Sequence, residues 1–269
     1  MRIRFTKAHG AKNDFLLTWR RDAPEGDLDA IARAICDRHT GAGADGWLLV
    51  APCVPGAGAE GEIQLYNSDG SAAELSGNGT RCAAALLIRH GHAADVARIR
   101  TGAGVKTLRL IERRGLRFEF EMNMGRPEIR AERLALPLST GSRDVTLVWV
   151  GNPQCAVPVE NFDFDWRAMG AEIETHPHFP NRTNVSFIKP VDEHSIDVRF
   201  YERGAGETMS SGTGSTGAAA AAIARGMARS PVHVLTPAGT LHLRIEQEAY
   251  LTGPAEIVAE GEFLLGEER

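Results

Sequence analysis

Alternating apolar and polar residues recur along this chain and predict many short β-strands. Stretches with apolar residues at helical spacing are fewer, and they predict four helices. Many strands with one long alanine-rich helix in each half of the chain are typical of an α+β protein. The strands are expected at residues 2–5, 47–50, 63–66, 108–111, 117–122, 145–150, 155–159, 185–188, 196–201, 233–236, 241–245 and 249–252. The helices are expected at residues 28–38, 80–90, 165–175 and 215–225.

Two of these helices follow the same glycine-rich motif. Residues 76–91 read SGNGTRCAAALLIRHG and residues 211–226 read SGTGSTGAAAAAIARG, an offset of 211 − 76 = 135 in a chain of 269 residues. Without gaps, 8 of the 16 aligned positions are identical. A repeat at half the chain length predicts two domains of like fold that face each other across a pseudo-two-fold axis.

We therefore expect two pseudo-symmetric domains, each a β-sheet rolled around its central helix. A boundary near Gly115 gives an N-terminal domain of residues 1–114 and a C-terminal domain of residues 115–259, and the tail 260–269 is expected to pack back on the first. Each central helix would present its N-terminus, with free N–H groups and a partial positive charge, to one cleft between the domains. Such a cleft would suit a carboxylate held with one reactive group on each side.

Composition and charge argue against several classes of protein. The 30 Lys and Arg against 35 Asp and Glu give a net charge of −5, and no basic cluster indicates nucleic-acid binding. The longest lipid-like stretch, residues 218–223, is too short to cross a membrane, and the first residues lack the apolar run of a signal peptide. The four cysteines have no CxxC spacing, and the histidines form no HxxxH or HExxH motif. These features predict a reduced cytoplasmic protein without a metal site.

Polar residues at the ends of predicted strands are candidates to line the cleft. Arg203 is the best candidate for a bidentate carboxylate clamp, and its alternative role is a surface salt bridge with Glu202 or Glu207. Asparagine amides both donate and accept, which suits an amino-acid zwitterion, although asparagine is also common in turns. The serines before the two helices are equally typical of helix N-caps, and no nucleotide-binding motif is present. The candidate asparagines are Asn13, Asn67, Asn78, Asn152 and Asn184.

The order of motifs along essentially the whole chain resembles the diaminopimelate epimerase family, whose wider fold group includes proline racemase. The resemblance implies two pseudo-symmetric domains with the active site between them. It also implies an enzyme that converts LL-diaminopimelate to the meso form in lysine and peptidoglycan precursor synthesis, with no cofactor and no metal. A small-molecule amino-acid substrate follows, and a homodimer is an assembly common in the family. The motifs are HGAKNDF, TGAGADGWLLV, YNSDGSAAELSGNGTRC, VGNPQC, RTNVSF, YERGAGET, SGTG and TGPAEIVAEGEF.

The resemblance also implies roles for individual residues. Amides and charged groups would hold the substrate amino and carboxylate groups, with Arg203 on the distal carboxylate. The backbone N–H groups at the two helix starts would receive the carboxylate next to the reacting carbon and stabilise its growing negative charge. The side chains implied are Asn13, Asn67, Asn152, Asn184, Glu202 and Arg203, and the backbone pairs are Gly77 with Asn78 and Gly212 with Thr213.

One departure from the family concerns the reacting groups themselves. The family places a cysteine at the first residue of each glycine motif, one as thiolate and the other as thiol, but here Ser76 and Ser211 hold these catalytic positions. An alcohol is far less acidic than a thiol of pKa about 8.5, so an unassisted serine is a poor base. Gln154 stands in place of the family's histidine, and Cys82 and Cys155 are expected to be buried packing residues.

Three interpretations of the serines follow. The protein is an epimerase whose serines act with assistance or slowly. Alternatively, it is a related cofactor-independent isomerase, racemase or dehydratase of another small acid, or a binding homologue with impaired catalysis. In the third interpretation the serines were engineered to trap a substrate, which Gln154 disfavours, because a designed trap would keep the histidine. Glu202 could supply an acid or base if burial raised its pKa, although its charge would oppose substrate carboxylates.

Overall fold

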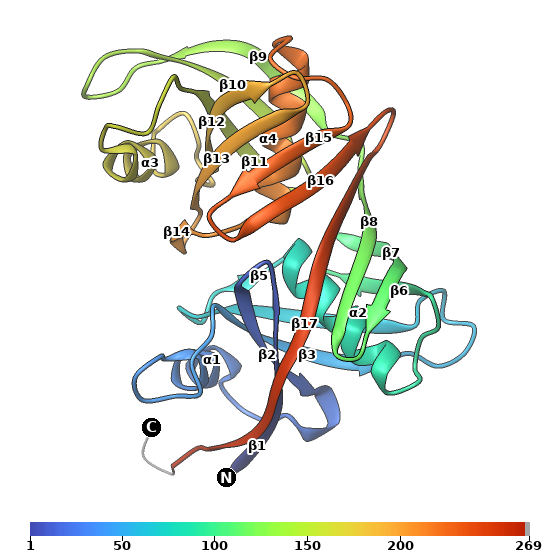
Figure 1. The fold of residues 1–269 in the computed structure, drawn as a ribbon. Helices are drawn as coiled ribbons and strands as arrows, with labels where there is room; N and C mark the ends of the chain where they lie inside the picture. The colour runs from blue at the N-terminus through green and yellow to red at the C-terminus, as the bar shows by residue number, and fades with distance from the viewer. Residues whose placement is uncertain (267–269) are drawn as a thin grey trace. The chain divides into compact units, whose positions relative to one another are not determined.

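The computed structural model describes residues 1–266 as a mixed α+β fold, rich in strands and with four α-helices in that range (Figure 1). The chain divides into two compact units, one of Met1–Met122 with Gly253–Arg269 and the other of Asn123–Thr252. The boundaries expected at 114/115 and 259/260 fall in the turn after β7 (Gly104–Arg114) and within β17 (Ala249–Leu264). The predicted domain division stays a prediction, and residues 267–269 of the predicted tail lie outside the described part of the chain.

The first unit is built around helix α2. Strand β17, the last strand in the sequence, also belongs to its sheet. Its hydrogen-bonded strands follow the order β17–β1–β2–β3–β4–β6–β7–β8, and β5 pairs with β4. The pairs β2–β3 and β4–β6 are parallel, because α1 and α2 cross over between their strands, and the other pairs are antiparallel. The elements are β1 (Arg2–Gly10), β2 (Asn13–Trp19), η1 (Arg20–Asp22), α1 (Leu28–Cys36), β3 (Gly46–Pro52), β4 (Gly61–Asn67), β5 (Ala72–Ala73), α2 (Gly77–Arg89), β6 (Val96–Thr101), β7 and β8 (Arg117–Gly125).

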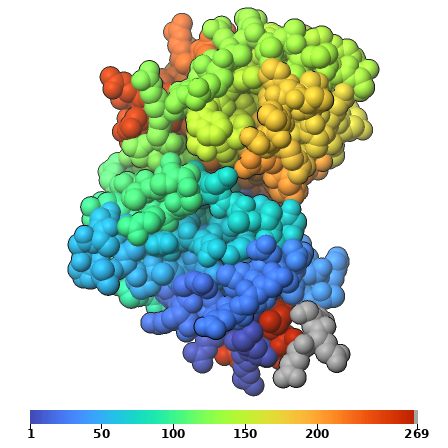
Figure 2. Space-filling view, turned by 180° about the vertical axis from the view of Figure 1, so that it is seen from behind, coloured from blue at the N-terminus to red at the C-terminus, as the bar shows by residue number. Residues whose placement is uncertain are grey.

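Strand β17 ties the end of the chain to its beginning. It pairs antiparallel with β1 from His9 and Glu256 to Arg2 and Leu264, and it also pairs with β8. The red C-terminal part of β17 lies beside the dark-blue start of the chain in Figure 1 and again from behind in Figure 2. The last strand in the sequence is therefore part of the first unit's sheet.

The second unit repeats this order of pairings. Its strands follow β9–β10–β11–β12–β13–β15–β16–β17 with β14 on β13, and β11–β12 and β13–β15 are the parallel pairs. Helices α3 and α4 make the crossovers that α1 and α2 make in the first unit. The elements are β9 (Glu128–Leu136), β10 (Arg143–Trp149), β11 (Pro153–Pro158), α3 (Trp166–Glu174), β12 (Asn184–Asp192), β13 (Ser195–Glu202), β14 (Gly206–Thr208), α4 (Gly212–Ala224), β15 (Val232–Thr236) and β16 (Gly239–Ile245).

Helices α2 and α4 are the cores of their units. Every residue from 77 to 87 and from 212 to 222 is buried. A helix buried on all sides needs small side chains where strands approach closely, which explains the alanine-rich sequence. Helix α4 contacts β9 to β13, β15 and β16, and α2 contacts β1 to β4 and β6.

All twelve predicted strands overlap observed strands, and the four predicted helices are confirmed with shifted ends. Both central helices begin three residues earlier than predicted, because a serine cap and two glycines open each one. Strands β2, β5, β6, β9 and β14 were not predicted. Within the described residues, no helix has both the length and the apolar character needed to cross a membrane.

The tight packing of α4 makes a stability prediction. Ala219 is 0% exposed, whereas Ala224 in the last turn is only partly buried. Ala219→Leu forces added methyl groups against the surrounding strands and should lower the free energy of unfolding by about 1–3 kcal/mol. The matched Ala224→Leu should change it by less than about 0.5 kcal/mol. Urea denaturation of both variants measures the difference, and equal effects would contradict all-round packing of this helix.

Candidate active site

Ser76 immediately precedes α2 and caps it. Its backbone is extended, and its Oγ accepts a hydrogen bond from the N–H of Gly79 at 3.1 Å. Its carbonyl oxygen accepts from the hydroxyl of Thr80 at 2.7 Å. The N–H groups of the first helical residues have no acceptor within the helix, and Gly77 and Asn78 hold these positions. The start of α2 therefore presents a partial positive charge beside the Ser76 hydroxyl.

Ser211 has the same role at the start of α4, with one addition. Its Oγ accepts from the N–H of Gly214 at 3.0 Å, and its hydroxyl donates to Oε2 of Glu202 at 2.7 Å. Oε1 of Glu202 accepts from the hydroxyl of Thr208 at 2.6 Å. Ser211 is 3% exposed, so little water competes for this charge-assisted bond. The Glu202 carboxylate is thus placed to accept the Ser211 proton.

The two halves of the repeat differ in this respect. The offset that aligns Ser76 with Ser211 aligns Asn67 with Glu202, since 67 + 135 = 202. The Asn67 amide donates to Oγ of Ser71 at 3.0 Å. No hydrogen bond from Ser76 to a carboxylate is present among residues 1–266. Both serines cap a helix, but only Ser211 is bonded to a carboxylate.

Two candidate asparagines of the first unit are hydrogen-bonded to each other. The amide of Asn78 donates to Oδ1 of Asn13 at 3.2 Å, and the amide of Asn13 donates to Oδ2 of Asp45 at 2.7 Å. Oδ1 of Asn78 accepts from the guanidinium of Arg81. An Arg only donates and an ionised Asp only accepts, so these two charged groups fix the orientation of both amides.

The turn before Asn13 is strained. Ala11 and Lys12 have φ values of 50° and 61°, and they form the two-residue turn between β1 and β2. Positive φ at both turn residues matches the twist of a hairpin, but it is unusual for residues other than Gly or Asn. The pairing of Gly10 with Asn13 across this turn holds the Asn13 side chain near α2.

Four charged side chains surround Asn13 and balance one another. Arg38 contacts Asp14 at 2.7 Å and Asp45 at 2.6 Å, and Lys7 contacts Asp14 at 3.1 Å. Burial acts to raise the pKa of Asp14, but hydrogen bonds from Arg38 and Lys7 outweigh it and lower the pKa below its usual value. Asp14 therefore stays ionised at neutral pH, and the two cations and two anions of this network balance in formal charge.

Candidate residues of the second unit also gather near the start of α4. The Asn152 amide donates to the hydroxyl of Thr213 at 3.4 Å, and Gln154 donates to Oδ1 of Asn152 at 2.7 Å. Gln154 is 3% exposed, and its Oε1 has no hydrogen-bond partner among the described residues. The residue in the family's histidine position thus orients Asn152 and carries no charge.

Asn184 and Arg203 lie together through the backbone. The N–H of Arg203 donates to Oδ1 of Asn184 at 3.1 Å, and one guanidinium N–H donates to the carbonyl of Asn181 at 3.3 Å. Glu207, one of the two salt-bridge partners considered for Arg203, instead binds Arg167 at 2.5 Å. Within residues 1–266 Glu207 is thus paired with Arg167, and the assignment of Arg203 stays a prediction.

Two of the four cysteines have the buried packing role predicted for them. Cys82 on α2 and Cys155 on β11 are 0% exposed, which confirms their expected burial. Burial raises the pKa of Cys82 to about 12 and also raises that of Cys155, so both stay protonated thiols at neutral pH. Among residues 1–266, no three His, Cys, Asp or Glu side chains are placed to hold a metal ion.

Sequence reasoning missed three residues that the structure joins to the candidates. Asp45 binds Asn13, Thr208 binds Glu202 and Arg81 binds Asn78. Arg81 lies in SGNGTRC, and Thr208 lies in YERGAGET just before SGTG. Their closeness in sequence to the two glycine-rich motifs could have marked both as site candidates. In the first unit Asn13 bonds Asn78, which follows Ser76 by two residues, and in the second unit Glu202 bonds Ser211 while Asn152 bonds Thr213. Within residues 1–266 the side chain of Asn67 is bonded to Ser71 and to none of the other candidates.

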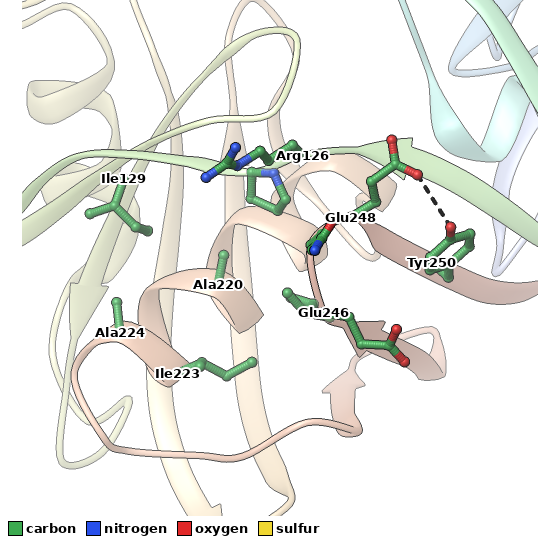
Figure 3. Close-up of a pocket in the computed structure, with 11 residues that line it drawn as sticks. Arg126, Ile129, Ala220, Ile223, Ala224, Glu246, Glu248 and Tyr250 are labelled. Atoms are coloured by element: carbon green, nitrogen blue, oxygen red, sulfur yellow. Dashed lines mark hydrogen bonds between the residues drawn. The ribbon is translucent and has the colours of Figure 1, made fainter.

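Two surface hollows are lined by other residues. One of about 540 Å³ lies along β1 and the end of β17. The other, of about 1140 Å³, lies beside the last turns of α4 (Figure 3). There Ala220, Ile223 and Ala224 form an apolar floor, and Tyr250 donates to Glu248 at 3.2 Å at the rim. Neither hollow is lined by a predicted site residue, so the candidate site stays at the starts of α2 and α4.

Solved structures of low sequence identity share this fold. A hydroxyproline epimerase from Agrobacterium vitis matches with a TM-score of 0.76 at 15% identity, covering 97% of this chain and 92% of that one. A probable proline racemase from Agrobacterium radiobacter matches with a TM-score of 0.78 at 16% identity, covering 99% and 93%. A protein of the PhzF phenazine-biosynthesis family from Bacillus anthracis matches with a TM-score of 0.72 at 15% identity, covering 98% and 100%. These likenesses establish the α+β fold.

The sequence itself gives the narrower assignment. The family model described as diaminopimelate epimerase matches residues 5–129 and 146–258. The diaminopimelate epimerase of Pelotomaculum thermopropionicum is 37% identical, over 97% of this chain and 99% of its own. That of Archaeoglobus fulgidus is also 37% identical, over 100% and 99%. The chain belongs to the diaminopimelate epimerase family.

Proposed function

We propose that this protein inverts the α-carbon of LL-diaminopimelate to give the meso form, without a cofactor, in lysine and peptidoglycan precursor synthesis. Ser76 and Ser211 are the proposed acid and base. The observation that carries the proposal is the hydrogen bond of 2.7 Å from Ser211 to Glu202. It supplies the assistance that an alcohol needs to accept a proton from carbon.

The proposed step conserves protons and electrons. The α-hydrogen moves as a proton to Oγ of Ser211, while the original hydroxyl proton of Ser211 moves to Oε2 of Glu202. The electron pair of the broken C–H bond stays on the substrate and spreads into the adjacent carboxylate. Reversal of both transfers returns a proton to the same face of the carbon. Inversion requires Ser76 to deliver its proton to the opposite face of that carbon. Glu202 then releases its extra proton to water, and the Ser76 alkoxide regains a proton from water.

The proposed substrate contacts follow from the hydrogen-bonding capacity of each group. The N–H groups of Gly77 with Asn78 and of Gly212 with Thr213 are assigned to the carboxylate next to the reacting carbon, where its charge grows during deprotonation. Arg203 is assigned to the distal carboxylate, which a bidentate guanidinium suits. The remaining amino and carboxylate groups are assigned to Asn13, Asn67, Asn152, Asn184 and Glu202.

The difference between the serines predicts unequal rates. An amide at Asn67 does not accept a proton as the Glu202 carboxylate does, and within residues 1–266 Ser76 is hydrogen-bonded to no carboxylate that could assist it. In D₂O, diaminopimelate should therefore exchange its α-hydrogen with retention faster than it is inverted. Proton NMR measures the exchange, and chiral chromatography of the LL and meso forms measures the inversion. Exchange that always accompanies inversion would contradict the assisted-serine proposal.

Variants at the two serines distinguish a wrong substrate assignment from slow proton transfer on the right substrate. Ser211→Ala and Glu202→Gln should each slow the exchange by roughly a hundredfold or more, the usual contribution of a general acid or base. Ser76→Ala should slow inversion and leave retentive exchange largely in place. The double variant Ser76→Cys with Ser211→Cys should accelerate inversion, because a thiolate is far more accessible than an alkoxide. If neither the native nor the double-cysteine protein acts on diaminopimelate, the substrate assignment is wrong.

Thiol reagents provide an independent prediction. The pKa of Cys36 is raised to about 12, chiefly by burial and also by Asp14, and the pKa of Cys82 is raised to about 12 by burial. Iodoacetamide at pH 8 should therefore label only Cys53, which is partly exposed, and should leave the exchange rate unchanged. The double-cysteine variant should lose its activity under the same treatment. Mass spectrometry locates the label, and inactivation of the native protein would place a thiol in the reaction.

A further inference from the structure

Arg81 is a fully buried cation at the start of the first unit's central helix. It is 0% exposed and lies one turn into α2. Its Nε donates to the carbonyl of Pro254 at 3.0 Å, and its Nη2 donates to Oδ1 of Asn78. Its Nη1 has no hydrogen-bond partner among residues 1–266. A guanidinium carries five N–H donors, so part of its donor capacity is unused.

No carboxylate in the described part of the chain balances this charge. The nearby network of Lys7, Asp14, Arg38 and Asp45 contains two cations and two anions and is already neutral. By contrast, Arg225 in the second unit has a side chain that is 6% exposed, and it forms an ion pair with Asp144 at 2.8 Å. An unpaired buried charge is costly, and proteins usually pair it.

Arg81 is nevertheless charged under ordinary conditions. Burial lowers its pKa to about 10, which leaves the guanidinium protonated at pH 7. The partial positive charge at the start of α2 adds to it, because Asn78 is the second residue of that helix. This end of the first unit therefore holds excess positive charge, and a bound anion would neutralise it.

The hydrogen bonds around Arg81 select the kind of anion. Because Arg81 occupies Oδ1 of Asn78, the NH₂ group of Asn78 faces away from Arg81 and donates to Asn13. Asp45 orients the NH₂ group of Asn13 in the same way. Arg81 thus fixes Asn78 so that its NH₂ group, and not its Oδ1, faces away from the guanidinium. Donors with a net positive charge favour a carboxylate over an ammonium group.

We propose that Arg81 is the counter-charge for the substrate carboxylate at the start of α2, and that it acts through Asn78 as a positioning residue. This inference rests on the proposed function for the identity of the substrate. The charge of Arg81 would count most as the α-carbon loses its proton, because negative charge then builds up on that carboxylate. Gly10 packs against Arg81 and Asn78. A Cβ added at Gly10 would lie 3.2 Å from Nη2 of Arg81, so a larger residue there would crowd the guanidinium.

The test uses one simple carboxylate and the proposed substrate. In the full-length native protein, sodium acetate should raise the melting temperature above that in sodium chloride at equal ionic strength. Arg81→Met should abolish this increment and weaken binding of meso-diaminopimelate by roughly ten- to a hundredfold, measured by titration calorimetry. Arg81→Lys keeps the charge but loses the forked hydrogen bonds, and it should retain the acetate increment.

A matched control separates charge from packing. Arg225→Met removes a buried arginine that has its own counter-anion, so it should lower the melting temperature and leave the acetate increment intact. If Arg81→Met does not fold, Arg81→Lys decides the question, and loss of the increment there overturns the proposal. Unchanged acetate and substrate responses in a folded Arg81→Met protein also overturn it. An Arg81-dependent acetate response without diaminopimelate binding would support the carboxylate site and refute the proposed substrate.

Discussion

The capping hydrogen bond of a serine at each helix start is the interaction on which both halves of the proposed site depend. In each unit one serine hydroxyl caps the start of the central helix and occupies the proposed reacting position. As a cap it uses an oxygen lone pair to accept from Gly79 or Gly214, which leaves its own proton available for donation. The helix start thus sets where the hydroxyl lies, and its neighbours set what it can do. For Ser211 the neighbour is the Glu202 carboxylate, whereas Ser76 lacks such a partner within residues 1–266.

The position of each cap depends in turn on a buried helix. Residues 77–87 and 212–222 are surrounded by strands, so the helices cannot shift without disturbing most of their unit's core. Small residues permit this enclosure, and glycines after each serine let neighbouring side chains press against the first turn. A Cβ at Gly217 would lie 2.9 Å from Gln154, which itself orients Asn152. Packing and site geometry are therefore set by the same few residues.

Much of this could be predicted from sequence because the signals are local or repeated. The twelve expected strands and the two central helices follow from periodicity, and the repeat drew attention to Ser76 and Ser211. Strand β2 was missed because its buried run NDFLLTW does not alternate, and the mostly exposed β9, EIRAERLAL, lacks a clear apolar face.

The contact of Arg81 with Pro254 joins residues 173 positions apart, and no local pattern predicts it. Nor could the sequence show that Glu202 contacts Ser211, since that bond depends on how the turn after β13 folds back to α4.

Alcohols where the family resemblance implies thiols change what the rest of the proposed site must supply. A thiol can become a base by losing its own proton, but a serine hydroxyl must pass its proton to another group as it accepts one. That requirement makes the charges around each serine decisive. The second unit supplies a carboxylate that can store a proton, and Gln154 adds no competing charge. The first unit supplies positive charge at Arg81 and the start of α2, which favours a substrate carboxylate over an ionised base. Such a division of labour suits proton exchange on the Ser211 face, whereas inversion in either direction must also pass through the unassisted Ser76.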